Sequence, residues 1–434
     1  MNIALIGLGK LGYPMAEFLS SSALSINCYD KNEKLVLDLI NGRNYLEFEN
    51  GLRKYVNNGN KLKLHLKIQD CLKDSSIVFI TVPTPSNNDG SFSNKYIIKV
   101  LNEISIYIKK NKRENPYLIN INSTVSPSSI NKDFIPYLEK KGLKNNIDFA
   151  LIYNPYFVAL GDVIKGLENP DLVLIGCENN YAKKKILDLY KTIYDFDKYA
   201  ILNFKEAEIT KLLVNSYLTL KISFSNMVKD LSEKLYDVNS KKILNAIGSD
   251  SRIGKKYMQP GGPYAGPCFP RDNQALLNFS KSVNYKNELN KGIVKTNQLT
   301  LENLKSQLDI IKEKNFSSIF FAGIGYKPNT PSLENSFTLE LMEYCKKINL
   351  SFYYYDRYID EKIELGKRVL ELENFKKYSD IIFLPYIDRQ FNKINNKEGI
   401  IWDIWCQIEG PNVIRNTREI ELNKKSNLFY LKSI

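Results

Sequence analysis

The chain has 434 residues, of which 43% are hydrophobic and 25% are charged, a composition that excludes a fibrous or disordered protein and allows about three globular domains. Lys and Arg outnumber Asp and Glu by 61 to 48, but they are spread along the chain, so we expect a weak attraction for anionic ligands and no nucleic-acid binding. The single histidine, His65, excludes metal sites that need several imidazole ligands.

A buried strand is predicted at residues 2–6, and it leads into a glycine-rich turn and a helix. The turn contains Gly7, Gly9 and Gly12. A second predicted strand ends in Asp30, near the usual spacing from the last glycine. This is the dinucleotide-binding pattern, in which the glycines allow close approach of a pyrophosphate and the acid binds ribose hydroxyls. Because a carboxylate would repel a 2′-phosphate, the pattern favours NAD over NADP.

Further buried strands complete a first domain at residues 1–200. They are predicted at residues 77–82, 117–122 and 172–176. Polar residues follow two of them, with Thr84 after one and Thr124 after the next. Ligands of parallel sheets bind beyond these carboxyl ends, so we expect both residues near the cofactor. His65 lies on the polar face of another predicted strand, and we interpret it as structural.

Residues 206–236 have helical spacing without Pro or Gly, which predicts a rod about 45 Å long. It suits a domain connector or a dimer core within a central helical domain, residues 201–300. After a Gly- and Pro-rich loop, a new alternation of strands and helices predicts a second doubly wound domain, residues 301–434. The strands are expected at residues 318–323, 350–355, 379–384 and 399–402. The fold class is therefore α/β, with two Rossmann-like domains joined by a long central helix. Because the second domain lacks GxGxxG, it should hold something other than a second dinucleotide.

Six dispersed cysteines without a CxxC pair indicate a reducing compartment, which we take to be the cytoplasm, and no thiolate metal site. The first residues lack a basic region and no apolar stretch reaches about 18 residues, so neither a signal peptide nor a membrane span is expected. Cys268 stands out because it lies in a glycine-rich loop and is followed by Asp272. Lys211 and Asn215, four residues apart, share one face of the long helix.

In order along the chain, these segments resemble the nucleotide-sugar 6-dehydrogenases, the family of UDP-glucose 6-dehydrogenase. The matching motifs are GLGKLG, VPTP, NSTVSP, NPYFVALG, AEITKLLVN, SRIG, CFPRD and GYKPNT. The resemblance implies two successive oxidations of a sugar 6-hydroxymethyl group by two NAD molecules, through an aldehyde and a cysteinyl thioester. It also implies an NAD domain, a central helix that forms a homodimer, and a UDP-binding domain.

The resemblance assigns a role to each candidate residue. Cys268 is the expected nucleophile, Lys211 would stabilise the oxyanion with help from Asn215, and Asp272 would position or deprotonate water. Thr124 matches the family threonine that holds water or the reacting hydroxyl. The expected cofactor contacts are Gly7, Gly9, Leu11, Gly12, Asp30, Thr84 and Thr124. The expected substrate contacts are Tyr156, Phe157, Lys211, Asn215, Arg252, Tyr257, Gly262 and Lys327, with Arg252 reaching substrate across the dimer. No metal is expected.

Three departures from the family pattern bear on activity. Tyr156 and Leu160 stand where relatives carry carboxylates, one of which is the candidate base for thioester hydrolysis, and Glu334 stands where many relatives carry arginine. Loss of a positioned base typically slows a step by about a hundred- to ten thousand-fold. Either Asp272 fills this role, or hydrolysis is slow and the acyl-enzyme on Cys268 accumulates and could acylate an amine.

The leading hypothesis is oxidation of UDP-glucose to UDP-glucuronate for a surface polysaccharide such as a capsule. It rests on the sequence that follows Cys268, which resembles the UDP-glucose branch. GDP-mannose and UDP-N-acetylhexosamines remain alternative substrates. The alternative of another class is a protein that binds NAD and a nucleotide-sugar without turnover.

Overall fold

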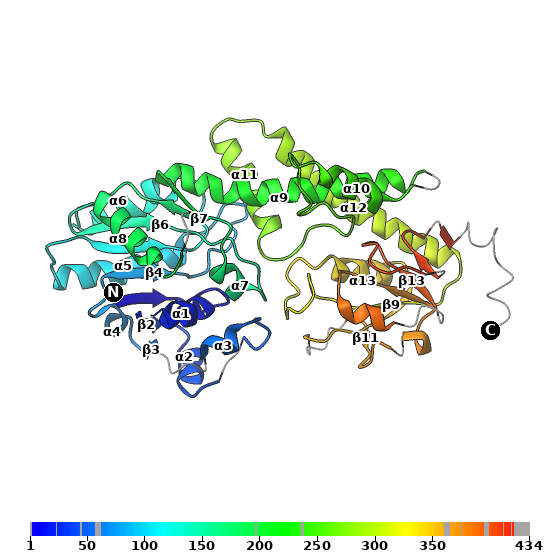
Figure 1. Cartoon of the computed structure of the whole chain (residues 1–434), viewed down its shortest axis with the longest axis horizontal. Coiled ribbons are helices and arrows are strands. Elements are labelled where there is room, and N and C mark those ends of the chain that lie inside the picture. Colours follow the sequence, from blue (N-terminus) through cyan, green and yellow to red (C-terminus); the bar gives the residue numbers. More distant parts are fainter. Residues whose placement is uncertain are drawn as a thin grey trace. The chain divides into compact units, whose positions relative to one another are not determined.

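The structure is a computed structural model of the chain (Figure 1). It describes residues 2–22, 24–43, 46–56, 62–195, 198–235, 238–359, 365–373, 375–394, 399–410, 412–417 and 419–420. The chain divides into two compact units. Unit 1 comprises Met1–Leu213 and Gln274–Asn284, and unit 2 comprises Val214–Asn273 and Tyr285–Ile434. This grouping does not test the division into three domains at residues 200 and 300, which stays a prediction.

Unit 1 is built on one sheet. Its described strands are β1 (Asn2–Ile6), β2 (Ser25–Tyr29), β3 (Leu62–His65), β4 (Ile77–Ile80), β5 (Tyr117–Ile121), β6 (Phe149–Tyr153), β7 (Val173–Gly176) and β8 (Tyr199–Leu202). They lie in the order β3-β2-β1-β4-β5-β6-β7-β8, and β6 and β7 form the antiparallel pair. In β1, Ile3 and Leu5 face one apolar cluster while Ala4 and Ile6 face the other. Both faces of the strand are thus buried, as in a parallel sheet covered by helices.

Helices cover the two faces of this sheet. One face carries α1 (Gly12–Ser21), α2 (Glu33–Ile40), α3 (Leu52–Val56), α7 (Val163–Glu168) and α8 (Asn180–Lys191). The other carries α4 (Ile68–Leu72), α5 (Lys95–Lys110), the π-helical turn η1 (Ile130–Phe134) and α6 (Ile135–Lys140). His65 ends β3, and its Nε2 lies 3.0 Å from the side-chain oxygen of Asn27.

Unit 2 contains a second sheet. Its described strands are β9 (Ser318–Phe321), β10 (Ser351–Tyr354), β11 (Lys367–Arg368), β12 (Ile381–Phe383), β13 (Ile400–Trp402) and β14 (Val413–Ile414). They lie in the order β11-β10-β9-β12-β13-β14, and each neighbouring pair is parallel. Helices α12 (Glu288–Glu313) and α13 (Phe337–Lys347) pack on one face, and the short 3-10 helices η2 (Phe375–Lys377) and η3 (Arg389–Lys393) contribute to the other. The predicted fold class, with two Rossmann-like sheets, is confirmed.

Two helices belong partly to each unit. The long helix α9 (Phe204–Ser232) has 29 residues, which at 1.5 Å per residue gives about 44 Å. It ends at Ser232 rather than at the expected Tyr236, which lies outside the described residues. Helix α11 (Phe269–Ser282) follows the loop that carries Cys268, and α10 (Ser240–Ser249) lies within unit 2.

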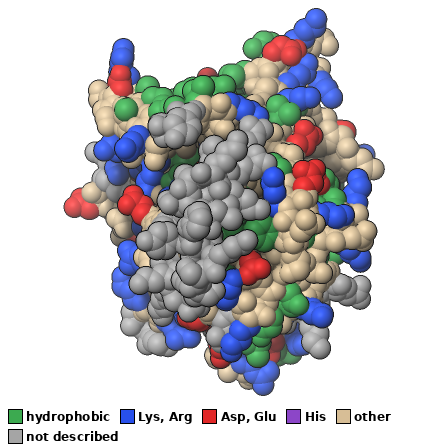
Figure 2. Space-filling model, turned by 90° about the vertical axis from the view of Figure 1, so that its right-hand side faces the viewer, with side chains coloured by type: hydrophobic (Ala, Val, Ile, Leu, Met, Phe, Trp, Pro, Cys, Tyr) green, Lys and Arg blue, Asp and Glu red, His purple; other side chains and the backbone are tan. Residues whose placement is uncertain are grey.

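On the face drawn in Figure 2, Lys and Arg of the described residues are scattered among acidic, apolar and other side chains instead of forming one stripe. Within the described part of the chain, no helix is both long enough and apolar enough to span a membrane.

Candidate active site

The glycine-rich turn after β1 has the backbone geometry that its motif predicts. Gly7 has a φ of +103°, which glycine adopts far more easily than other residues. A Cβ on Gly12 would lie 1.9 Å from the carbonyl oxygen of Gly7, whereas a Cβ on Gly9 would meet nothing within 4 Å. Leu11 is the N-cap of α1 and makes no side-chain cap bond. The open side of Gly9, beside the amino end of α1, therefore fits the close approach of a pyrophosphate.

Asp30 follows β2 and ties it to the glycine turn. One carboxylate oxygen accepts a hydrogen bond from the Leu8 N–H at 2.7 Å, and the other accepts one from the Asn32 N–H at 2.8 Å. Each oxygen has a second lone pair. The carboxylate can thus hold the turn and still accept bonds from ribose hydroxyls.

Thr84 and Thr124 meet beyond the carboxyl ends of β4 and β5. The Thr84 hydroxyl donates to the Thr124 carbonyl at 2.7 Å, so it joins the two strand-end loops. The segment after Thr124 is held by Glu208 of α9, whose carboxylate accepts from the N–H groups of Ser128 at 2.5 Å and Ile130 at 2.9 Å. Ser128 has a φ of +77°, an uncommon conformation for a residue other than glycine. Burial raises the Glu208 pKa from 4.5 to about 7, against the opposing effect of its two backbone hydrogen bonds.

Lys211 lies on α9 with 7% of its surface exposed. Its Nζ donates to the Tyr156 carbonyl oxygen at 2.8 Å and lies 4.4 Å from the centre of the Phe157 ring. Both contacts come from the loop after β6. A hydrogen bond and a cation–π contact thus direct the ammonium group, a suitable arrangement for stabilising a developing oxyanion.

The Tyr156 side chain packs against the apolar core of unit 1. Its hydroxyl lies 2.8 Å from the Tyr190 hydroxyl, which in turn donates to the Asn154 side chain. Burial raises the Tyr156 pKa to about 12, although the hydrogen bond to Tyr190 lowers it. A phenol with this pKa stays protonated at neutral pH. Tyr156 therefore does not replace the missing carboxylate as a base, and Leu160 brings no ionisable group.

Cys268 differs from the other cysteines in its exposure. All six residues carry thiols; Cys268 is exposed, and the other five are buried. Burial raises the pKa of each of those five thiols, which makes them poor nucleophiles. Cys268 immediately precedes α11, and its carbonyl accepts the Asp272 N–H at 2.9 Å.

Asp272 and Asn215 form a pair within unit 2. The Asn215 amide donates to the Asp272 carboxylate at 2.5 Å, and the two residues are 8% and 4% exposed. Asp272 lies one helical turn after Cys268 on α11, and the Asn215 amide of α9 contacts its carboxylate. Lys211 lies one turn before Asn215 on α9.

The remaining expected substrate contacts are dispersed over unit 2. Arg252 pairs with Asp250 at 2.6 Å and is largely exposed. Tyr257 has a φ of +65°. A Cβ on Gly262 would lie 2.6 Å from the Phe337 ring. Lys327 follows β9, and its carbonyl accepts from the Thr330 hydroxyl at 3.1 Å.

Asp356 has the same position in the second sheet as Asp30 in the first. Asp30 follows β2, the neighbour of β1, and Asp356 follows β10, the neighbour of β9. Its two carboxylate oxygens accept four backbone N–H groups, those of Ile324, Gly325, Tyr358 and Ile359. The residue is 5% exposed. Four bonds occupy its lone pairs, so Asp356 has no capacity left for a ribose.

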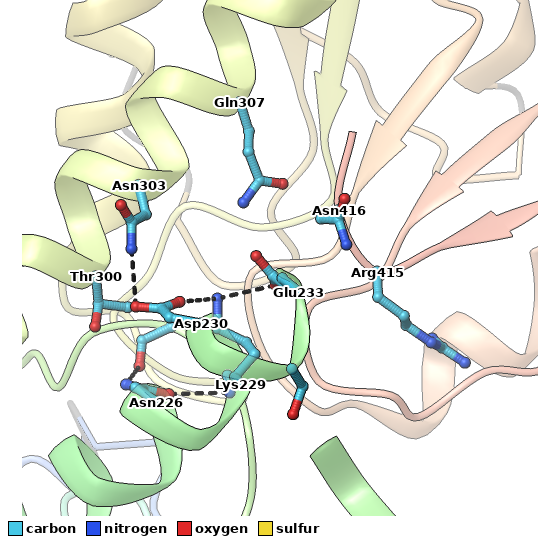
Figure 3. A network of polar contacts seen from close by, with 12 residues as sticks. Asn226, Lys229, Asp230, Glu233, Thr300, Asn303, Gln307, Arg415 and Asn416 are labelled. Atoms are coloured by element: carbon cyan, nitrogen blue, oxygen red, sulfur yellow. Dashed lines mark hydrogen bonds and ion pairs between the residues drawn. The ribbon is translucent and has the colours of Figure 1, made fainter. Parts of the chain in front are cut away.

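Polar residues also gather between α9 and α12 in unit 2 (Figure 3). Lys229 lies 3.3 Å from Asp230 and 3.6 Å from Glu233, and its side chain is 4% exposed. The Asn303 amide donates to Asp230 at 2.8 Å. Among the described residues, no group of three or more His, Cys, Asp or Glu could hold a metal ion.

Sequence comparison assigns this chain to a family. The profile of the UDP-glucose/GDP-mannose dehydrogenase NAD-binding domain matches residues 1–194, and the profile of the central domain of the same family matches residues 205–299. The chain belongs to the UDP-glucose/GDP-mannose dehydrogenase family. Its members are NAD-dependent nucleotide-sugar dehydrogenases, so the predicted family and the predicted cofactor, NAD, are both confirmed.

Similar proteins within this family have different substrates in their names. UDP-glucose 6-dehydrogenase of Rickettsia typhi is 27% identical over 447 residues, covering 99% of this chain and 98% of the relative. GDP-mannose 6-dehydrogenase of Pseudomonas aeruginosa is 26% identical, covering 92% of this chain and 94% of the relative. The solved UDP-glucose dehydrogenase of Pyrobaculum islandicum matches with a TM-score of 0.85 at 22% identity, covering 93% of each chain.

The sequence did not reveal every residue that shapes the site of this dehydrogenase. Glu208 lies in the AEITKLLVN motif, three residues before Lys211 on the same helix, but no role was predicted for it. Asn226 of α9 and Asn297 of α12 were also missed. They bond to the backbone of residues 261–264, and their spacing in the sequence carries no signal.

Proposed function

We propose that the protein oxidises the 6-hydroxymethyl group of UDP-glucose to the carboxylate of UDP-glucuronate, in the cytoplasm, for a surface polysaccharide. The observation that supports this most is the exposed Cys268 immediately before α11, followed one turn later by Asp272 with its Asn215 hydrogen bond. A covalent route needs an accessible thiol beside groups that can handle water and an oxyanion.

NAD, when bound, accepts the hydride in both oxidations. Between them, the Cys268 thiolate adds to the aldehyde carbon, and the resulting alkoxide is stabilised by Lys211. Loss of hydride from this adduct leaves a thioester. Water then adds to the thioester and the carbon–sulfur bond breaks. One proton of the water goes to the Cys268 sulfur, the other is lost to solvent, and the carboxylate product leaves.

Hydrolysis of the thioester is the step most affected by this chain's departures from its family. The Tyr156 phenol packs into the core with a pKa of about 12, and Leu160 is apolar. Asp272 is the carboxylate nearest to Cys268 along α11, and we assign it the handling of water, with Thr124. If this replacement is inefficient, the acyl-enzyme accumulates after a burst of two NADH per site.

A substrate panel tests the proposal. NADH absorbance is followed with UDP-glucose, GDP-mannose and UDP-N-acetylhexosamines, and we expect the highest kcat/KM for UDP-glucose. A higher kcat/KM for another nucleotide-sugar would correct the proposed substrate but leave the proposed reaction unchanged. No NADH at high enzyme concentration, together with ligand-induced thermal stabilisation, would favour a binding protein without turnover, which the Tyr156 and Leu160 positions make the second candidate.

We also propose a homodimer formed through α9. Between positions 213 and 231, every exposed residue of this helix is apolar. These residues are Leu213, Tyr217, Phe224, Met227 and Leu231. From Tyr217 on, they recur at intervals of 7, 3 and 4, the spacing of a helix–helix seam, and a second copy would bury them. Arg252 could then reach the partner's site. Sedimentation at micromolar concentration should show a dimer, and a fully active monomer would contradict the proposal.

A further inference from the structure

The cysteine loop, residues 260–268, lies in a part of unit 2 without helix or strand. Pro260, Pro263 and Pro267 have no N–H, so they cannot donate to a regular hydrogen-bond ladder. Residues 260–264 are nevertheless buried. Buried backbone groups need hydrogen-bond partners, and side chains of neighbouring helices must therefore provide them here.

Two asparagines provide these partners in the same manner. The Asn226 amide, on α9, donates to the Gly262 carbonyl at 2.9 Å, and its oxygen accepts the Gly261 N–H at 3.1 Å. The Asn297 amide, on α12, donates to the Tyr264 carbonyl at 3.1 Å and accepts the Tyr264 N–H at 2.7 Å. Each side chain thus supplies the donor and the acceptor that a neighbouring strand would provide. Such a pair of hydrogen bonds to the backbone requires both a donor and an acceptor on one side chain. A carboxylate has acceptors but no donor.

Aromatic rings limit the same loop from other directions. A Cβ would lie 2.1 Å from the Trp405 ring at Gly261, 2.6 Å from the Phe337 ring at Gly262 and 2.5 Å from the Tyr326 ring at Gly266. All three distances are below any ordinary carbon contact. The loop backbone therefore packs directly against the rings, while the asparagines bind its polar groups. Both sets of contacts restrict the conformation of the loop.

Asn226 is buried, and a hydrogen bond joins the two helices that carry the asparagines. Asn226 is 1% exposed, and one turn later on α9 Asp230 accepts the Asn303 amide of α12 at 2.8 Å. Figure 3 shows Asn303 reaching Asp230 across the two helices. This bond links α9 to α12, the two helices that carry Asn226 and Asn297.

Cys268, the last residue of the loop, leads directly into α11. Its carbonyl accepts the Asp272 N–H at 2.9 Å, so the first turn of the helix restrains it from the other end. The exposed thiol thus lies between two restrained segments, and its position depends on the conformation of residues 260–267.

We propose that Asn226 and Asn297 are positioning residues that hold the cysteine loop, and we call them the asparagine clamps. They govern the attack of Cys268 on the aldehyde and not the first oxidation. This inference rests on the proposed function. In the attack, a carbon–sulfur bond forms and the π-electron pair of the carbonyl moves to oxygen, which gives the alkoxide that loses hydride in the second oxidation. The first oxidation removes a hydride and a proton from the alcohol and forms no bond to sulfur.

The test uses Asn226→Asp and Asn297→Asp, which keep the size of each side chain but replace its donor with a second acceptor. Enzyme in excess over UDP-glucose is mixed rapidly with NAD, and the two phases of NADH formation are recorded while an aminooxy reagent traps free aldehyde. Asn239→Asp is the control, because Asn239 caps α10 through its oxygen alone and aspartate caps equally well. Gly261→Ala displaces the loop because its Cβ would collide with the Trp405 ring. It replaces Asn226→Asp in the test if that variant does not fold.

We expect the second phase to slow about 10- to 100-fold in the clamp variants, since a misplacement of about 1 Å can have such an effect, with release of aldehyde. Enzyme and NAD are kept at saturating concentrations, so that a weaker substrate contact at Gly262 does not limit the first phase. The first phase of both variants, and both phases of the control, should then stay within about twofold of the wild type. Equal slowing of both phases, or of neither, would overturn the inference. If the wild type forms no NADH, the proposed function has failed, and the rate of Cys268 alkylation by iodoacetamide tests the clamp alone. A rate altered in the clamp variants but not in Asn239→Asp supports it, and equal rates refute it.

Discussion

Glu208 provides a quantitative prediction about pH and stability. It is fully buried and holds the segment after Thr124, and its pKa rises from 4.5 to about 7 because burial disfavours the charged form. Two backbone N–H groups and Lys205 oppose this rise, and Asp133 adds to it. At about 1.36 kcal/mol for each tenfold change in proton affinity, the shift corresponds to about 3 kcal/mol.

The sign follows from linkage. A carboxyl group whose pKa is raised by folding favours the native state when it is protonated. Its contribution is complete below pH 4.5 and is lost as the pH rises through about 7. Glu208→Gln does not titrate. Between pH 5 and pH 8, the unfolding free energy of the wild type should therefore fall by about 2–3 kcal/mol relative to this variant.

The assay is urea unfolding at several pH values, followed by far-ultraviolet circular dichroism. Tryptophan fluorescence is unsuitable because both tryptophans, Trp402 and Trp405, lie in unit 2. Glu139→Gln, an exposed carboxylate of α6, controls for the change in net charge. A difference between wild type and Glu208→Gln that is the same at pH 5 and pH 8 would refute the reasoning.

Four further outcomes are expected. Gly12→Ala should lower the unfolding free energy by about 1–3 kcal/mol because its Cβ meets the Gly7 backbone. Gly9→Ala should keep the stability within about 0.5 kcal/mol and weaken NAD binding in a fluorescence titration. Equal stability of the two variants would contradict this prediction. Tyr156→Phe should cost about 1 kcal/mol in urea unfolding and leave the rate of NADH formation unchanged, and a large loss of rate would place the phenol in the chemistry. Cys268→Ser should stop uronate formation, as product analysis would show, and sustained uronate would remove the thiol from the mechanism. Met227→Arg should shift sedimentation toward the monomer; an unchanged dimer would exclude this face of α9.

The local motifs were predictable from the sequence, and the long-range contacts were not. Gly7, Gly12 and Asp30 act through backbone geometry within one strand–turn–helix segment, so their spacing carries the information. The strand β6 was not predicted, although its apolar run from Phe149 to Tyr153 carries the signal, and β14 has only two residues, too few for a recognisable period.

The asparagine clamps show why the rest could not be predicted. Asn226 and Asn297 lie in helices, where their sequence neighbours have no bearing on the loop that they bind. Asparagine is abundant in this chain, so residue type does not distinguish them either. Tyr156 illustrates the same limit, because its motif predicts a substrate contact, while the fold turns its phenol toward Tyr190.

The two bonds that Asp30 accepts from Leu8 and Asn32 have a consequence for attempts to engineer cofactor preference. Replacing this acid by a neutral or basic residue is the obvious way to admit a phosphorylated cofactor. Here the same carboxylate holds the turn that approaches the pyrophosphate, and the equivalent Asp356 holds its turn in a sheet that carries no dinucleotide motif. A substitution at Asp30 would therefore loosen the glycine-rich turn after β1 at the same time as it changes the charge. A designed switch should first supply another acceptor for the Leu8 N–H.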